Sequence, residues 1–225
     1  MKKLYIAVTV LAVVAAAIIG LSQCGKPSDT PEKKDMPEIV DLGLSVKWAD
    51  RNLGASSSYE YGDYFAWGET KSKATYYWDN YKFTTDKAFC DESYSANEWL
   101  KPEDDAATAA LGAGWRMPTY DEMCELVSKC MWERVMRNGV NCYKVTSKVN
   151  GNCIYLPLAG FKKDAKLERQ NRRGYYWASE RSMYSNTCGN YLNLFSLEND
   201  RGIMVAMRYR NQGLSVRPVY DAKIK

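Results

Sequence analysis

The chain has 225 residues, of which 46% are hydrophobic and 13% aromatic, a composition typical of a folded globular protein. Its formal net charge is +4, from 31 Lys and Arg against 27 Asp and Glu, and this near-balance does not favour nucleic-acid binding. The chain contains no histidine, which excludes Ser-His-Asp and Cys-His catalysis and histidine zinc sites within it.

The N-terminal segment has the pattern of an export signal. Two lysines precede an apolar run over residues 4–21, and a short polar stretch follows and ends at Cys24. The sequence "LSQC" resembles a bacterial lipobox, although Gln23 replaces the usual Gly, Ala or Ser. We therefore predict a signal peptide over residues 1–23 and lipidation of Cys24. The alternative is an uncleaved membrane anchor, because the apolar run is just long enough to span a bilayer.

Residues 24–38 are rich in proline and charged side chains, which predicts a linker that carries the lipid anchor. A folded domain is expected over residues 39–225. The lipoprotein interpretation predicts an exported protein anchored to the outer membrane, and it leaves undecided whether the protein lies on the periplasmic or the surface face. An exported protein can form disulfides. The cysteines after Cys24 allow several pairings or burial as small apolar side chains: Cys90, Cys124, Cys130, Cys142, Cys153 and Cys188.

The first half of the domain predicts short strands and turns over residues 46–55, 61–69 and 74–83, where aromatic residues alternate with glycines. A helix is expected over residues 101–114. Pro102 suits its first turn, the acidic run 103–105 complements its dipole, and Gly112 ends it. That acidic run could alternatively bind calcium, but acids at a helix start more often only favour the dipole.

The stretch "GWRMPTYDEMCEL" predicts a second helix. Thr119 and Glu122 have the spacing of a capping box, in which each side chain accepts a hydrogen bond from the other residue's backbone N–H. Apolar side chains then recur at helical spacing and predict one buried stripe. The stripe consists of Met123, Leu126, Val127, Cys130 and Met131.

The second half of the domain predicts mostly strands. A hairpin is expected over residues 141–160, with Asn150-Gly151 in a type I′ turn, and further strands over 174–179, 190–197 and 213–219. Polar loops are expected over residues 180–189 and 198–212, although the apolar part of the second could be a further strand. Two helices followed by many strands predict an α+β fold with a mostly antiparallel sheet.

Recognised catalytic motifs are absent from the sequence, including GxSxG, the P-loop and GxGxxG, and no metal or cofactor is expected. The two polar loops combine Tyr, Asn and Arg, which suit recognition of sugars or protein surfaces. An ordinary solvated loop is the alternative. The exposed candidates are Tyr184, Asn186, Asn199, Asp200, Arg201, Arg208, Tyr209, Arg210 and Asn211.

Several blocks resemble a known family when they are taken in chain order. They are "VDLGLSVKWADRNLGA", "YGDYFAWGE", "PEDDAATAALGAGWRMPTYDEM", "NGVNCYKV", "NGNCIYLPLAGF", "GYYWAS" and "GLSVRPV". From about Val40 to Val219 the chain resembles the major paralogous domain (FISUMP-type) family of exported Bacteroidetes-type lipoproteins. The resemblance implies a C-type lectin-like fold, related to the formylglycine-generating-enzyme domain. It also implies that Trp115 and Arg116 brace the second helix against the sheet and are not reagents.

The resemblance also points to a ligand surface. In related variable proteins the residues just before the final strand bind the ligand. Here that implies Asn199, Asp200, Arg201, Met204, Met207, Tyr209 and Asn211. The sequence departs from the family at Cys142 and Cys153, where a local disulfide or a change in packing is expected. The calcium-lectin signatures Glu-Pro-Asn and Trp-Asn-Asp are absent, and no cysteine pair of the formylglycine-generating type can be placed.

Together these features predict a non-catalytic binding lipoprotein that recognises a glycan or a protein through loops 180–189 and 198–212, and that binds no nucleic acid. Its candidate ligand-binding residues are Tyr184, Asn186, Asn199, Asp200, Arg201, Met204, Met207, Tyr209 and Asn211. One alternative is a structural component of an envelope assembly, with Met204 and Met207 in a hydrophobic interface. Another is an enzyme, because fold alone does not decide function.

Overall fold

The computed structural model describes residues 36–86, 90–195 and 202–223. The predicted signal peptide, Cys24 and the candidates Asn199, Asp200 and Arg201 lie outside the described residues. Among the described residues, none of the helices is long and apolar enough to cross a bilayer.

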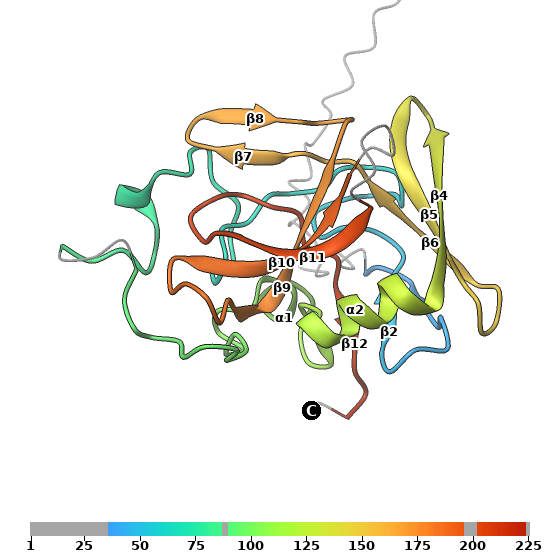
Figure 1. The fold of residues 1–225 in the computed structure, drawn as a ribbon, viewed down its shortest axis with the longest axis horizontal. Helices are drawn as coiled ribbons and strands as arrows, with labels where there is room; N and C mark the ends of the chain where they lie inside the picture. The colour runs from blue at the N-terminus through green and yellow to red at the C-terminus, as the bar shows by residue number, and fades with distance from the viewer. Residues whose placement is uncertain (1–35, 87–89, 196–201, 224–225) are drawn as a thin grey trace, which may run out of the picture. The chain divides into compact units, whose positions relative to one another are not determined.

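The described residues form an α+β fold, as the sequence predicted, with antiparallel pairing in every sheet (Figure 1). The strand orders are β1-β2-β12-β3, β11-β10-β9, β4-β5-β6 and β7-β8. The helices are α1 (Ala106–Leu111) and α2 (Tyr120–Lys129), with a 3-10 helix at Trp78–Asn80. The strands are β1 (Ile39–Val40), β2 (Lys47–Ala49), β3 (Trp115–Arg116), β4 (Cys130–Arg137), β5 (Val140–Ser147), β6 (Cys153–Pro157), β7 (Phe161–Lys163), β8 (Lys166–Glu168), β9 (Gly174–Arg181), β10 (Cys188–Leu194), β11 (Ile203–Tyr209) and β12 (Val219–Tyr220).

Helix α1 is shorter than the sequence predicted. It begins at Ala106, because the Asp105 carboxylate accepts hydrogen bonds from the backbone N–H groups of Ala107 and Thr108 and so acts as the N-cap. Pro102 therefore lies before the helix and not in its first turn. Gly112 ends the helix as expected, with a φ of 88° that favours glycine.

Helix α2 begins as predicted. Thr119 is its N-cap, and the reciprocal capping box with Glu122 is present. The predicted buried stripe is correct for Met123, Leu126 and Cys130, and Val127 is partly buried, but the helix ends at Lys129. Met131 is therefore an exposed residue of β4, and its place in the predicted stripe is wrong.

Strands β4, β5 and β6 form a meander with two Asn-Gly turns, and only one of the two is tight. Asn138 and Gly139 have φ values of 48° and 78° and join β4 to β5, where Arg137 pairs with Val140. A two-residue connection with positive φ at both positions is a type I′ turn. Asn150-Gly151 instead lies in the longer connection between β5 and β6, so the predicted type I′ turn there is wrong.

The sheet β11-β10-β9 lies between two hydrophobic clusters, because side chains alternate across a strand. On β9, Tyr175 and Trp177 face one cluster, while Tyr176 and Ala178 face the other. The aromatic cluster consists of Leu53, Tyr64, Phe65, Ala66, Trp67, Tyr76, Tyr81, Phe83, Cys90, Tyr94, Leu100, Ala106, Ala107, Met117, Ala159, Phe161, Tyr175, Trp177, Tyr191, Leu214 and Val216. The aliphatic cluster consists of Leu42, Val46, Trp48, Met123, Leu126, Cys130, Tyr143, Val145, Ile154, Leu156, Leu158, Tyr176, Ala178, Leu192, Leu194 and Val219.

The predicted loop over residues 198–212 is wrong for much of its length. Residues 203–209 form β11, which pairs with β10 along its whole length and is an edge strand of its sheet. The alternative of a further strand is therefore correct for this part. Ile203 and Val205 pack against the aliphatic cluster, and Ala206 packs against the aromatic cluster.

Candidate functional site

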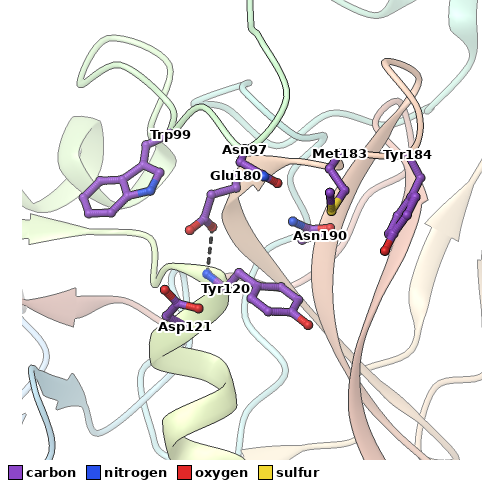
Figure 2. A pocket seen from close by; sticks show the side chains of 8 residues that line it. All are labelled: Asn97, Trp99, Tyr120, Asp121, Glu180, Met183, Tyr184 and Asn190. Atoms are coloured by element: carbon purple, nitrogen blue, oxygen red, sulfur yellow. Dashed lines mark hydrogen bonds between the residues drawn. The ribbon is translucent and has the colours of Figure 1, made fainter.

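A cavity of about 440 Å³ opens where four separate segments meet (Figure 2). The loop before α1, the first turn of α2, the end of β9 with the turn that follows it, and β10 supply its walls. Its lining residues are Asn97, Trp99, Tyr120, Asp121, Glu180, Met183, Tyr184 and Asn190.

Backbone hydrogen bonds place the loop before α1 beside the end of β9. The Asn97 N–H donates to the Arg181 carbonyl at 3.2 Å, and the Leu100 N–H donates to the Ser179 carbonyl at 3.0 Å. Trp99 and Glu180 form an isolated antiparallel bridge between these two contacts. This pairing thus places Trp99 and Glu180, which are distant in the chain, in the lining of the same cavity.

The aromatic side chains of the cavity are exposed. Tyr184 is 80% exposed and Trp99 is 50% exposed, values that are high for large apolar rings. The Trp99 ring lies 5.5 Å from the Arg116 guanidinium. Arg116 is itself held by two hydrogen bonds to the Glu122 carboxylate of α2. The Trp99 ring is therefore half exposed while Arg116 packs close to it and supports it.

Glu180 is the buried carboxyl of the cavity, and Figure 2 shows it beside the start of α2. It accepts a hydrogen bond of 2.8 Å from the Tyr120 N–H. The pKa of Glu180 is raised to about 7, mainly by burial; hydrogen bonds to its charged form oppose the shift, and the nearby Glu122 carboxylate adds to it. Near neutral pH this carboxyl therefore populates both a proton-donating and a proton-accepting state.

A second cavity of about 430 Å³ also has Trp99 in its lining. Its walls are mostly apolar and include Leu100, Pro102 and Trp115. Trp115 packs edge-on against Tyr220 of β12 at 5.3 Å, and Arg116 connects β3 to α2 through Glu122. These contacts are those of the bracing role that the resemblance implied for Trp115 and Arg116.

The structure brings one predicted candidate, Tyr184, into the first cavity. The Asn186 amide donates to the Glu92 carboxylate and lies outside the lining. Met204, Met207 and Tyr209 are exposed on β11 and are also outside the lining.

Two expected surface residues are buried. Asn211 is 4% exposed and donates to the Tyr76 carbonyl at 3.0 Å. Arg210 is 0% exposed and packs against the rings of Trp67 and Phe83. The prediction that both are exposed is wrong, because aromatic residues of the first half of the domain cover them.

Sequence reasoning missed Trp99 and Glu180. Trp99 follows a polar stretch, "CDESYSANE", and precedes Pro102, so an exposed tryptophan was a readable signal there. Glu180 directly follows the buried strand residues 174–179, where an acidic residue at the end of an apolar run was a second signal.

Within the described residues, no three or more Cys, Asp or Glu side chains are grouped so that they could hold a metal ion. The six described cysteines are free thiols. Cys142 lies opposite Pro157 and Cys153 lies opposite Thr146, so the register places the two thiols four residues apart along β5. A disulfide between Cys142 and Cys153 is therefore excluded in this fold.

Comparison of the chain with models of protein families, with curated proteins and with solved structures gave no match.

Proposed function

We propose that this chain is a non-catalytic binding protein that recognises a glycan at the cavity between Trp99 and Tyr184. One observation carries the proposal: two exposed aromatic side chains share one open cavity with the polar side chains of Asn97, Glu180 and Asn190. This proposed site replaces the ligand surface that the sequence predicted on loop 198–212. Of the predicted candidates, it includes only Tyr184.

The chemistry of the cavity suits a sugar ring. The C–H groups on one face of a pyranose pack against an aromatic ring, and Trp99 offers a large flat surface at low conformational cost because Arg116 supports it. Asn97 and Asn190 provide both donors and acceptors for hydroxyl groups. Glu180 adds a carboxyl that can accept or donate.

We also propose that the α+β domain is a C-type lectin-like domain of the major paralogous domain family, exported and lipid-anchored through Cys24. The resemblance of the sequence blocks supports this assignment, as does the order of the elements, in which two short helices precede the central strands. If the signal peptide is cleaved before Cys24 and Cys24 is lipidated, the purified protein has the mass of residues 24–225 plus the mass of the attached lipid.

A binding screen tests the function. The purified protein is applied to a glycan and mucin array, with calcium present or chelated, beside Trp99→Ala, Tyr184→Ala and the control Tyr209→Ala. Tyr209 is 54% exposed on β11, outside the cavity, and so matches the cavity residues in exposure.

We expect the wild type and Tyr209→Ala to bind a glycan, and Trp99→Ala and Tyr184→Ala to lose that binding. Loss in Tyr209→Ala alone would move the site to β11. If the folded wild-type protein binds nothing on the array, glycans are excluded as ligands. If a bound glycan is cleaved, the protein is a hydrolase and not only a binding protein.

A second candidate function is that of a structural component of an envelope assembly. Met204, Met207 and Tyr209 are about half exposed along the edge strand β11, which favours contact with another protein surface. Stable oligomers of the wild-type protein that Met204→Glu disperses would support this function, and a monomer at all concentrations would contradict it.

A further inference from the structure

The hairpin of β7 and β8 and the loop that follows it carry the net charge of the chain (Figure 1). Residues 161–173 hold two acids, Asp164 and Glu168, and six cations. The cations are Lys162, Lys163, Lys166, Arg169, Arg172 and Arg173. Six cations against two acids leave +4, which equals the formal net charge of the whole chain. The rest of the sequence is therefore balanced, and the excess positive charge is concentrated in this one short segment.

Two of the six cations contact aromatic rings of the fold. Lys162 Nζ lies 5.4 Å from the centre of the Tyr64 ring, and the Arg173 guanidinium lies 4.9 Å from that of Phe195. The other four are exposed, and between described residues none of them forms an ion pair. We call these four the hairpin cations: Lys163, Lys166, Arg169 and Arg172.

Two of the hairpin cations face each other across the strands. In the register of β7 and β8, Lys163 lies directly opposite Lys166. Like charges at paired positions of an antiparallel ladder repel and destabilise it. The same arrangement becomes favourable when an anion lies beside both ammonium groups, because attraction to the anion then offsets their repulsion.

The loop after β8 holds the two arginines in an ordered backbone. The Arg169 carbonyl accepts a hydrogen bond from the Arg172 N–H at 3.0 Å. The Asn171 side-chain oxygen accepts from the Asn141 N–H at 2.7 Å, and the Asn171 N–H donates to the Leu158 carbonyl at 2.7 Å. Because these bonds fix the loop before a ligand arrives, little backbone freedom is lost on binding.

Arg169 and Arg172 border an open hollow of about 540 Å³. Its other lining residues are Leu167, Glu168 and Gln170, so the lining has two cations and one acid. A guanidinium presents paired N–H donors that match the two oxygens of a carboxylate or a similar oxyanion. The Gln170 amide offers a donor and an acceptor that suit a hydroxyl group. The hollow therefore combines recognition of an anion with a partner for a sugar hydroxyl.

The surface fits a polysaccharide better than a membrane or a nucleic acid. Docking on a bilayer uses several exposed apolar side chains, whereas Leu167 is the one large apolar side chain exposed in residues 161–173. Single-stranded nucleic acids stack their bases on exposed aromatic rings, and Phe161, the one aromatic residue of this segment, is buried. An anionic polysaccharide requires neither feature.

We propose that the hairpin cations form a second binding site, which takes an anionic polysaccharide bearing carboxylate or sulfate groups. Arg169 and Arg172 hold one anionic group at the hollow, and Lys163 and Lys166 attract a neighbouring group of the same polymer. The site shares no lining residue with the cavity of Trp99, so its failure and that of the proposed glycan cavity are distinguishable.

The experiment measures equilibrium binding of the full chain to heparin as a sulfated polymer, to polygalacturonate as a carboxylated one and to neutral dextran, at low and high salt. The test variant combines Arg169→Gln with Arg172→Gln. A matched control combines Lys71→Gln with Lys101→Gln, which removes the same charge from exposed positions outside the hairpin. A third variant, Arg169→Lys with Arg172→Lys, keeps the charge and removes the paired donors. The Tm of each variant verifies that it folds.

We expect the wild type to bind heparin, polygalacturonate or both, to bind dextran not at all, and to bind more weakly as salt rises. The glutamine variant is expected to bind about tenfold more weakly or less, because it loses charge-assisted hydrogen bonds from two side chains. The lysine variant is expected to fall between it and the wild type. The Lys71 and Lys101 control and Trp99→Ala are expected to bind these polymers as the wild type does.

Two results would overturn the proposal directly. One is no binding of the folded wild type to either anionic polymer at low salt, and the other is an equal loss in the glutamine variant and in the Lys71 and Lys101 control. Phosphatidylglycerol vesicles and single-stranded DNA are tested in parallel. If either binds more tightly than both polysaccharides, and the glutamine variant loses that binding, the partner is a membrane or a nucleic acid and the assignment to a polysaccharide is wrong.

Discussion

The aromatic cluster and the aliphatic cluster bury opposite faces of the same sheet by different means. The aliphatic cluster is enclosed by α2 and by the regular strands of the β4-β5-β6 meander, whose backbones satisfy their own hydrogen bonds. The aromatic cluster is covered largely by irregular segments between β2 and α1. Irregular backbone that is buried needs partners from side chains.

The polar ends of the aromatic side chains supply those partners. The Tyr76 hydroxyl donates to the Tyr64 carbonyl, the Tyr81 hydroxyl donates to the Trp67 carbonyl, and the Trp177 indole N–H donates to the Phe65 carbonyl. The abundant Tyr and Trp of this chain therefore supply hydrogen-bond donors to the loops in addition to apolar volume.

Trp67→Ala is expected to destabilise the fold the most, by about 4 kcal/mol. The change removes a fully buried ring that packs edge-on against Tyr94 at 5.1 Å, and it leaves the Ala178 carbonyl without its indole donor. Urea unfolding measures the loss. Trp99→Ala is the matched control, because its ring is half exposed and its removal is expected to cost less than about 1 kcal/mol. Equal losses in the two variants would contradict the structural role of the aromatic cluster.

Leu126→Ala tests the aliphatic cluster by the same measurement. We expect a loss of about 3 kcal/mol, because the fully buried side chain leaves a cavity between α2 and the strands without affecting any hydrogen bond. Val127→Ala, one position further on the same helix and only partly buried, is the control and is expected to lose about 1 kcal/mol. A larger loss for Leu126→Ala than for Trp67→Ala would reverse the ranking of the two clusters.

Glu180→Gln tests the effect of a buried carboxyl near the end of β9, beyond the residues that pack into the two clusters. The folded-state pKa of Glu180 is about 7, above the ordinary value of 4.5, so its contribution to stability is fully present below pH 4.5 and is lost as the pH rises through 7. A glutamine stays neutral. Relative to the wild type, the variant is therefore expected to gain on the order of 2 kcal/mol between pH 4.5 and pH 8.

Unfolding in urea at pH 4.5 and pH 8 measures this gain, with Glu133→Gln on the exposed part of β4 as the control. If the difference in unfolding free energy between Glu180→Gln and the wild type is the same at both pH values, the pKa of the Glu180 carboxyl is not raised by burial.

Tyr81→Phe isolates the polar role of the aromatic cluster and is expected to give the smallest loss, about 1 to 2 kcal/mol. It preserves the ring but removes a hydroxyl that donates to the Trp67 carbonyl at 2.7 Å and accepts from Arg210 Nε at 3.0 Å. Thermal unfolding compares it with Tyr209→Phe on the exposed face of β11. No difference between the two variants would mean that the hydroxyl groups do not hold the irregular segments.

Part of the site was within reach of the sequence. Tyr184 was predicted from its polar loop, and the start of α2, which supplies Tyr120 and Asp121, follows from the capping box of Thr119. Trp99 and Glu180 were not predicted, because each becomes a site residue only through the backbone contacts between the segment before α1 and the end of β9. Arg210 and Asn211 were misplaced for the related reason that a polar side chain can be buried when distant acceptors are available.

Features that depend only on neighbours along the chain could be predicted from the sequence. It specified the start of α2 through Thr119 and Glu122, the end of α1 at Gly112, and the antiparallel α+β class through strands separated by turn residues. The tertiary structure decided which Asn-Gly pair forms the tight turn, because both have the right residues and only Asn138-Gly139 lies where the register of β4 and β5 leaves two residues to connect. It also decided the burial of Arg210 and the meeting of Trp99 with Glu180, since these depend on contacts between distant segments that no local pattern records.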